Sequence, residues 1–132
     1  MNKIRMIALA ACMAATLDAS AQEQEIRLFS HRGGRMEHDE NTLSAFQASY
    51  DAGYRGFETD IRMTRDGALV ITHDSSLERT TDGTGTVEEK TEAEIRRLRT
   101  KQGNKVLFLD ELLEFLEGKE LPGVAVLEDK IG

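Results

Sequence analysis

Hydrophobic positions along residues 22–132 recur with helical spacing in some stretches and with strand alternation in others, which predicts one unit of mixed strands and helices. Leu43, Phe46 and Tyr50, for example, fall at i, i+3 and i+7, on one helical face. The predicted elements are, in chain order, a strand over Ile26–Ser30, a helix that begins at Asn41 or Thr42 and closes at Gly53, strands over Arg55–Arg62 and Ala68–His73 joined by an Asp66-Gly67 turn, a helix from a Thr91–Glu94 capping box through Leu98, a helix from about Asp110 to Gly118, and a strand over Val124–Glu128. The last strand is almost continuously apolar, which is typical of a strand buried on both faces of a parallel sheet.

The second predicted strand carries two acids on one face. Because strand side chains alternate, Phe57, Thr59 and Ile61 share one face and Glu58 and Asp60 share the other. The two carboxylates start about 6.6 Å apart along the strand, so both can reach one cation, and oxygen ligands suit Mg²⁺ or Ca²⁺. Taken alone, the pair is better explained as two surface acids on a solvent-exposed strand face, since exposed carboxylates are common.

Polar residues follow several of the predicted strands, which is where α/β folds place their sites. His31 and Arg32 follow the first strand, His73 ends the hairpin, and Glu128 ends the last strand. A pair of histidines can divide acid and base work near neutral pH, and arginine pairs with a phosphate or with a carboxylate of the site. His38 lies in a polar loop, and we assign it no role.

The first 21 residues have the outline of a secretory signal peptide. Lys3 and Arg5 precede an apolar run over Met6–Leu17, and small residues at 19 and 21 fit a cleavage site before Gln22. The run is too short to span a bilayer, so we expect no stable membrane span and an exported protein, periplasmic or secreted. Lipoprotein anchoring through Cys12 is the less favoured alternative.

Composition narrows the chemistry further. The formal net charge of -7 argues against a nucleic-acid surface built on a basic patch. Cleavage before Gln22 removes the single cysteine, so the exported chain has no disulfide and no thiolate ligand. Any metal is then held by oxygen and histidine.

Several short motifs lie along the chain in a fixed order. They are His31-Arg32-Gly33, Glu40-Asn41-Thr42-Leu43 with Ala45-Phe46, Gly56-Phe57-Glu58-Thr59-Asp60, Thr64-Arg65-Asp66-Gly67, Val70-Ile71-Thr72-His73-Asp74, Arg79-Thr80-Thr81 and Glu128-Asp129-Lys130, with Leu109–Leu116 as a helix before the last of them. Together they resemble the glycerophosphodiester phosphodiesterase family, within the superfamily of phosphatidylinositol phospholipase C-like phosphodiesterases, from about residue 28 to the C-terminus.

The resemblance implies an α/β fold in which residues 22–132 form a partial domain, the N-terminal half of a TIM (β/α)8 barrel with a β-hairpin insertion. It implies metal-dependent cleavage of glycerophosphodiesters, such as glycerophosphocholine, to glycerol 3-phosphate and an alcohol. Carried over by position, it assigns a divalent cation, Mg²⁺ or Ca²⁺, to Glu58, Asp60 and Glu128, general acid and base roles to His31 and His73, and phosphate binding to Arg32 with assistance from Lys130.

Two features depart from the family pattern. Asp39 stands where a proline usually precedes Glu-Asn-Thr, which we expect to leave this loop freer. The chain also ends soon after Glu128, about halfway along the family's barrel. We interpret residues 22–132 as a truncated part of a longer product, and the alternative is that the half barrel pairs with itself or with a partner.

Two other functions stay open at this point. One is a related phospholipase C- or D-like enzyme that acts on intact lipid, which the polar loops Gly33–Asn41 and Asp82–Lys90 disfavour. The other is a non-catalytic module or an inactive half-barrel fragment.

Overall fold

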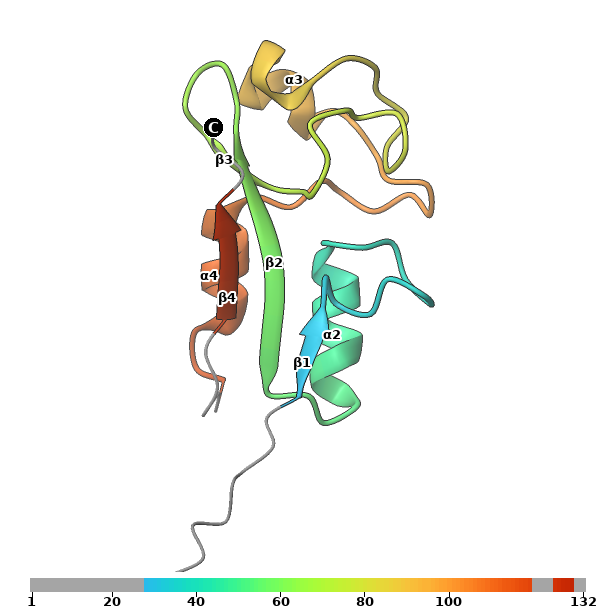
Figure 1. The fold of residues 1–132 in the computed structure, drawn as a ribbon, viewed down its shortest axis with the longest axis vertical. Coiled ribbons are helices and arrows are strands. Elements are labelled where there is room, and N and C mark those ends of the chain that lie inside the picture. The colour runs from blue at the N-terminus through green and yellow to red at the C-terminus, as the bar shows by residue number, and fades with distance from the viewer. Residues whose placement is uncertain (1–27, 120–124, 130–132) are drawn as a thin grey trace, which may run out of the picture.

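The structure, a computed structural model, describes residues 28–119 and the backbone of strand residues 125–129 (Figure 1). The predicted signal peptide over residues 1–21, with Cys12, and the predicted phosphate-site residue Lys130 lie outside the described residues. The side chain of Glu128 lies outside them as well, although its backbone is part of a strand.

The described elements follow the predicted order. They are β1 (Phe29–His31), α2 (Leu43–Asp51), β2 (Gly56–Met63), β3 (Leu69–Ile71), the 3-10 helix η1 (Val87–Glu89), α3 (Glu92–Arg96), α4 (Leu109–Leu116) and β4 (Ala125–Asp129). Only η1 was not predicted. Within the described ranges, every helix is too short or too polar to cross a bilayer.

β2 is the centre of the sheet and pairs with every other strand. It runs parallel to β1 and to β4, and its C-terminal end forms an antiparallel hairpin with β3. The register places Ser30 beside Phe57 and Leu127 beside Thr59. Parallel strands joined through helices, with one hairpin inserted, are the arrangement that the sequence predicts.

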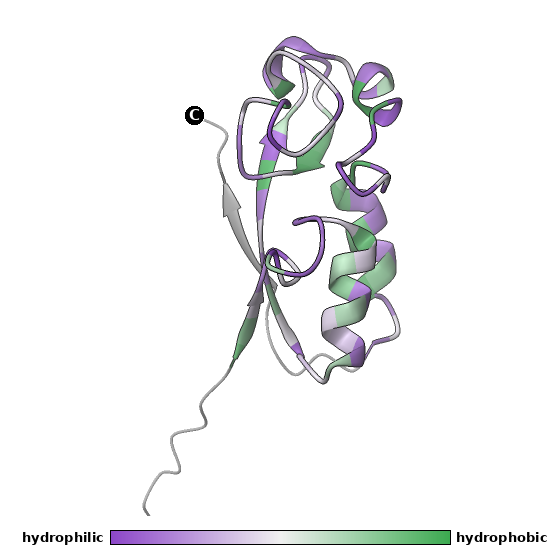
Figure 2. Cartoon of the chain, turned by 90° about the vertical axis from the view of Figure 1, so that its right-hand side faces the viewer, coloured by the Kyte–Doolittle hydropathy of each residue, from purple (hydrophilic) through white to green (hydrophobic). Residues whose placement is uncertain are grey.

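The two longer helices, α2 and α4, cover one face of the sheet, as the view turned by 90° shows (Figure 2). Phe57 and Ile61 of β2 point toward them and pack with Phe46 of α2 and Leu112 of α4. The rings of Phe46 and Phe57 meet edge to face with centroids 5.7 Å apart. The hydrophobic face of β2 therefore packs against the helices, and its acidic face points to the opposite side of the sheet.

Local sequence signals explain where the helices begin and end. The Thr42 hydroxyl accepts a hydrogen bond from the Ala45 amide at 3.2 Å, so Thr42 rather than Asn41 caps α2. Gly53 follows the helix with a φ of +99°, a left-handed conformation that glycine adopts without strain. The predicted capping box of Thr91 and Glu94 opens α3.

The expectation of a freer loop at Asp39 is wrong. Its carboxylate accepts hydrogen bonds from the Gln102 amide at 2.7 Å and from Asn104 Nδ2 at 3.4 Å, and its own amide donates to Gln102 Oε1 at 3.4 Å. A carboxylate replaces the rigidity of proline with a tether to a turn more than 60 residues away in the chain. The loop before α2 is thereby held in place.

Candidate active site

The acidic face of β2 is largely shielded from solvent. Asp60 is fully buried and the Glu58 side chain is about one-fifth exposed, so the pair does not form a solvent-exposed strand face. A buried carboxylate needs a compensating charge or hydrogen bonds, because leaving it alone in a low-dielectric interior is costly. The partners of these two acids therefore define the site.

The first partners come from the end of β1. His31 lies beside Glu58 in the sheet register, and its Nε2 is 3.5 Å from Glu58 Oε2. The next residue, Arg32, donates its backbone amide to the Glu58 carbonyl at 2.9 Å. The structure therefore brings His31 and Arg32, at the end of β1, together with Glu58, the third residue of β2.

The Arg32 guanidinium is paired with carboxylates of the site. Its Nε lies 3.2 Å from Asp60 Oδ2, and its Nη1 lies 3.3 Å from Glu40 Oε1. The sequence left open whether this arginine meets a phosphate or a carboxylate, and the structure shows two carboxylates. Arg32 is itself 8% exposed, so these pairs are well shielded from solvent.

The loop between β1 and α2 has an unusual backbone that aims Arg32. Arg32 and Asn41 both have positive φ, 52° and 58°, and the Asn41 amide donates to the Arg32 carbonyl at 2.9 Å. Asn41 Oδ1 also accepts from the Thr59 hydroxyl at 2.7 Å. Thr59, between the two acids on β2, thus ties the loop to the strand from the opposite face.

His73 belongs to a second cluster of charges. Its Nδ1 lies 2.6 Å from Asp74 Oδ1, and its carbonyl accepts from Arg62 Nε at 2.9 Å. Asp74 is in turn paired with the Nε of Arg79. The hydrogen bond from Arg79, followed by that from His73, lowers the pKa of Asp74 to about 2, so this carboxylate is ionised at neutral pH.

Arg79 joins this second cluster to the first. Its two terminal nitrogens reach both oxygens of Glu40, at 2.7 and 3.1 Å. The hydrogen bond from Arg79 is the main cause of the lowered pKa of Glu40, with Arg32 contributing as well. Glu40 and Arg79 are 39 residues apart, and sequence reasoning gave neither of them a role, although both lie inside the motifs quoted for the family resemblance.

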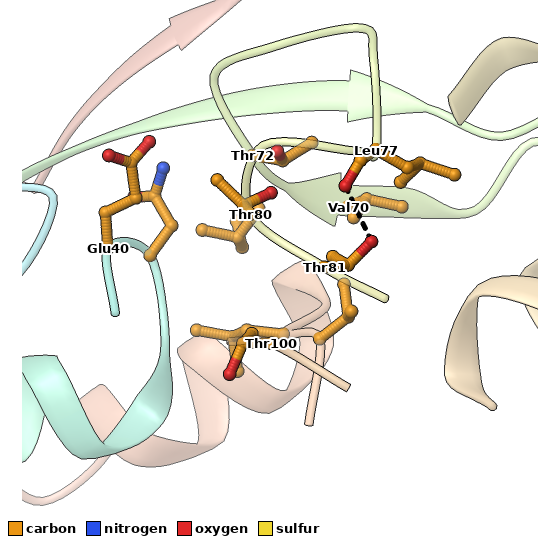
Figure 3. A pocket seen from close by; sticks show the side chains of 11 residues that line it. Glu40, Val70, Thr72, Leu77, Thr80, Thr81 and Thr100 are labelled. Atoms are coloured by element: carbon orange, nitrogen blue, oxygen red, sulfur yellow. Dashed lines mark hydrogen bonds between the residues drawn. The ribbon is translucent and has the colours of Figure 1, made fainter. Parts of the chain in front are cut away.

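The loops that carry these charges meet around a small cavity of about 20 Å³ (Figure 3). Glu40 from the loop before α2, Thr72 and Thr80 from the segment after β3, and Thr100 from a later turn line it. The Thr81 hydroxyl, also in the wall, donates to the Leu77 carbonyl at 2.7 Å. The cavity thus lies between the loop of Glu40 and the segment that carries Arg79.

The described donor atoms suit a hard divalent cation. Glu58 Oε2 is buried and has no hydrogen-bond partner among the described residues, its recorded contact being His31 at 3.5 Å. Glu128 of β4 is in register with Asp60, so the backbone brings a third acid to the same row. Among side chains that the structure describes, no three His, Cys, Asp or Glu residues form a metal-binding cluster, and the side chain of Glu128 is outside that set.

Comparisons with known proteins place these features in a family. The model of the glycerophosphoryl diester phosphodiesterase family matches residues 31–131. A glycerophosphodiester phosphodiesterase of Caldanaerobacter subterraneus is 41% identical over 71 residues, which are 54% of this chain and 29% of that protein. The chain thus spans less than a third of the length of this curated relative.

Solved structures show the same likeness in three dimensions. A glycerophosphodiester phosphodiesterase from Agrobacterium tumefaciens matches with a TM-score of 0.70 and 32% identity, over 81% of this chain and 47% of that one. A phosphodiesterase of Oleispira antarctica, solved with the product sn-glycerol-3-phosphate, matches with a TM-score of 0.73 and 29% identity. This match covers 81% of this chain and 45% of that one. The α/β unit is part of the TIM-barrel fold of these proteins, which confirms the predicted fold class.

Proposed function

Since the chain belongs to the glycerophosphoryl diester phosphodiesterase family, we propose that the protein hydrolyses glycerophosphodiesters to glycerol 3-phosphate and an alcohol, with a divalent cation at Glu58 and Asp60. The convergence of His31 and Arg32, at the end of β1, with Glu58 and the buried Asp60 of β2 carries the proposal. The Oleispira antarctica structure, which holds sn-glycerol-3-phosphate as product, supports the product assignment.

Arg32 is the phosphate-binding residue in this proposal. Its Nε forms an ion pair with Asp60 and its Nη1 donates to Glu40, and Nη2 would donate its N–H groups to a phosphate oxygen. The two carboxylates hold the guanidinium plane, so a diester meets a donor that is already oriented. Charge-assisted hydrogen bonds of this kind are stronger than neutral ones.

His31 and His73 perform the proton transfers. Cleavage of a phosphodiester needs a proton removed from the attacking hydroxyl or water and a proton given to the leaving alkoxide oxygen. His31, half-exposed at the end of β1, lies 3.5 Å from Glu58, and His73 is held through Nδ1 by Asp74. One histidine serves as base and the other as acid.

Glu58, Asp60 and Glu128 are the residues that would hold the cation. When bound, a hard divalent ion polarises a phosphoryl oxygen and offsets the negative charge that gathers on it during the reaction. The buried Oε2 of Glu58 and the exclusively oxygen and nitrogen donors of the described site support Mg²⁺ or Ca²⁺ over a thiophilic metal. Lys130, which follows Glu128 by two residues in the sequence, would add positive charge to the phosphate site. Removal of residues 1–21 as a signal peptide would place the protein outside the cytoplasm.

The test measures release of glycerol 3-phosphate from glycerophosphocholine and from glycerophosphoethanolamine by the protein expressed from its whole gene. Reactions contain Mg²⁺, Ca²⁺ or EDTA, and the variants are His31→Ala and His73→Ala. We expect EDTA to abolish release and each variant to lower kcat about 100-fold or more, with metal affinity of His73→Ala unchanged.

His38→Ala is the matched control, since His38 lies in the same loop as Arg32 outside the ion pairs of the site. It should keep the wild-type rate. Release that survives both EDTA and His31→Ala would overturn the proposed chemistry, and release lost equally in His38→Ala would show that the loop, rather than the imidazole, was being tested.

A further inference from the structure

One continuous series of ion pairs joins the two ends of the candidate active site. In order, its members are Asp60, Arg32, Glu40, Arg79, Asp74 and His73. Acidic and basic side chains alternate along it, so each carboxylate has a basic neighbour. The series starts at a proposed cation ligand and ends at a proposed acid/base, and Arg79 is its central link.

Arg79 makes the contacts of a bridging residue. Its terminal nitrogens bind both oxygens of Glu40 in a fork, and its Nε binds Asp74 from the same guanidinium plane. An ordinary exposed arginine pair contributes little, since solvent screens it and two long side chains must be ordered. Here one planar group is held by two carboxylates, one of which is 10% exposed, so its position is determined at both ends.

Asp74 connects Arg79 to His73, because it contacts both side chains. The Asp74 carboxylate, 2.6 Å from His73 Nδ1, accepts a hydrogen bond when Nδ1 carries the proton, and Nε2 then keeps the lone pair that can take up a proton. At the other end, Glu40 Oε1 accepts from Arg79 and also contacts Arg32 Nη1. One arginine therefore braces the partners of both functional side chains.

We propose that Arg79 is a positioning residue that sets the tautomer and orientation of His73 through Asp74 and braces Arg32 through Glu40. The proposal rests on the proposed function for the roles of His73 and Arg32 in catalysis. It assigns Arg79 no contact with substrate.

The test compares Arg79→Gln, Arg79→Lys and Glu40→Gln with the wild-type protein. The tautomer of His73 is read from ¹⁵N signals of its imidazole at about pH 8.5, where an ordinary imidazole is neutral. The kcat and KM for release of glycerol 3-phosphate are measured in parallel. Arg65→Gln is the matched control, because Arg65 is an exposed arginine paired with Glu94 outside the site.

We expect Arg79→Gln to decrease the fraction of His73 protonated at Nδ1 and to lower kcat/KM about 10- to 100-fold. Arg79→Lys keeps the positive charge but cannot bind both oxygens of Glu40 in the arginine geometry, so it should fold and retain only part of the wild-type kcat/KM. Glu40→Gln is the most informative variant, because in the described residues Glu40 is connected to His73 only through Arg79 and Asp74. It should shift the tautomer in the same direction.

Unchanged His73 signals in both Arg79→Gln and Glu40→Gln would overturn the positioning role. If Arg79→Gln does not fold, Arg79→Lys and Glu40→Gln decide the question by the same signals. A wild-type protein that releases no glycerol 3-phosphate would overturn the proposed function instead, and the ¹⁵N comparison would still decide whether Arg79 positions His73.

Discussion

Gly33 offers the sharpest stability test, because two separate penalties meet at this residue. Its φ is +77°, where an L side chain costs about 1 to 2 kcal/mol. A Cβ at this position would also lie 2.7 Å from Ala45 Cβ and 3.0 Å from the backbone nitrogen of Phe46. Relief of such overpacking against a helix backbone costs about 1 to 3 kcal/mol. Gly33→Ala should therefore lose about 2 to 5 kcal/mol of the free energy of unfolding.

Gly67→Ala separates the two penalties. Gly67 has a similar φ of +89°, but a Cβ there would meet no atom within 4 Å. This variant should lose only the backbone cost, about 1 to 2 kcal/mol. Urea-induced unfolding followed by far-UV circular dichroism gives both free energies from the same transition.

Catalytic activity should also differ between Gly33→Ala and Gly67→Ala. The overpacking at Gly33 displaces the segment that carries Arg32 from α2, so kcat/KM should fall in Gly33→Ala, whereas Gly67→Ala should keep the wild-type value. Equal stability losses in the two variants would refute the steric argument. Full activity in a folded Gly33→Ala would refute the claim that close packing against α2 positions Arg32.

Two further predictions concern the polar tethers. Asp39→Ala should lower the free energy of unfolding in urea by about 1 kcal/mol, because the Gln102 amide loses its acceptor. The control Asp51→Ala breaks one exposed hydrogen bond on a helix and should lower it by less than about 0.5 kcal/mol. Equal losses in the two variants would contradict the stabilising role of the Asp39 hydrogen bonds. The pKa of Asp74 is lowered from 3.8 to about 2, mainly by Arg79, so its contribution is present above about pH 4 and is lost as the pH falls toward 2. After allowance for solvent screening, Asp74→Asn should cost about 1 to 2 kcal/mol at pH 7, and a cost that stays constant in unfolding curves down to pH 2.5 would contradict this sign.

The sequence predicts most of the fold because the signals that shape these elements are local. The alternation of Phe57, Thr59 and Ile61 with two acids specifies both faces of β2, and caps at Thr42 and Thr91 specify where helices begin. Local patterns also place polar residues after the first strand and acids on the second, but β1 ends beside Glu58, the third residue of β2, and this register is a contact between distant segments.

The partners of these residues are set by contacts between distant segments, which no local pattern contains. Arg79 is an arginine in a loop whose neighbours in the sequence do not reveal Glu40 as its partner. Asp39 likewise finds its hydrogen-bond donors in a turn that only the folded chain brings near. The motifs that carry the family resemblance did contain Glu40, Asp74 and Arg79, and this was the signal that could have identified them.

The contacts that hold Arg32 in place also bear on the affinity of its guanidinium for a phosphate group. Both ends of this residue are held, the backbone by its hydrogen bonds to Glu58 and Asn41 and the guanidinium by Asp60 and Glu40. Ordering a free arginine side chain costs about 1.5 to 2 kcal/mol of conformational entropy. This cost is already met when the chain folds. If Arg32 binds phosphate as proposed, we expect a phosphate diester to bind roughly tenfold more tightly than to an equally placed but freely rotating arginine.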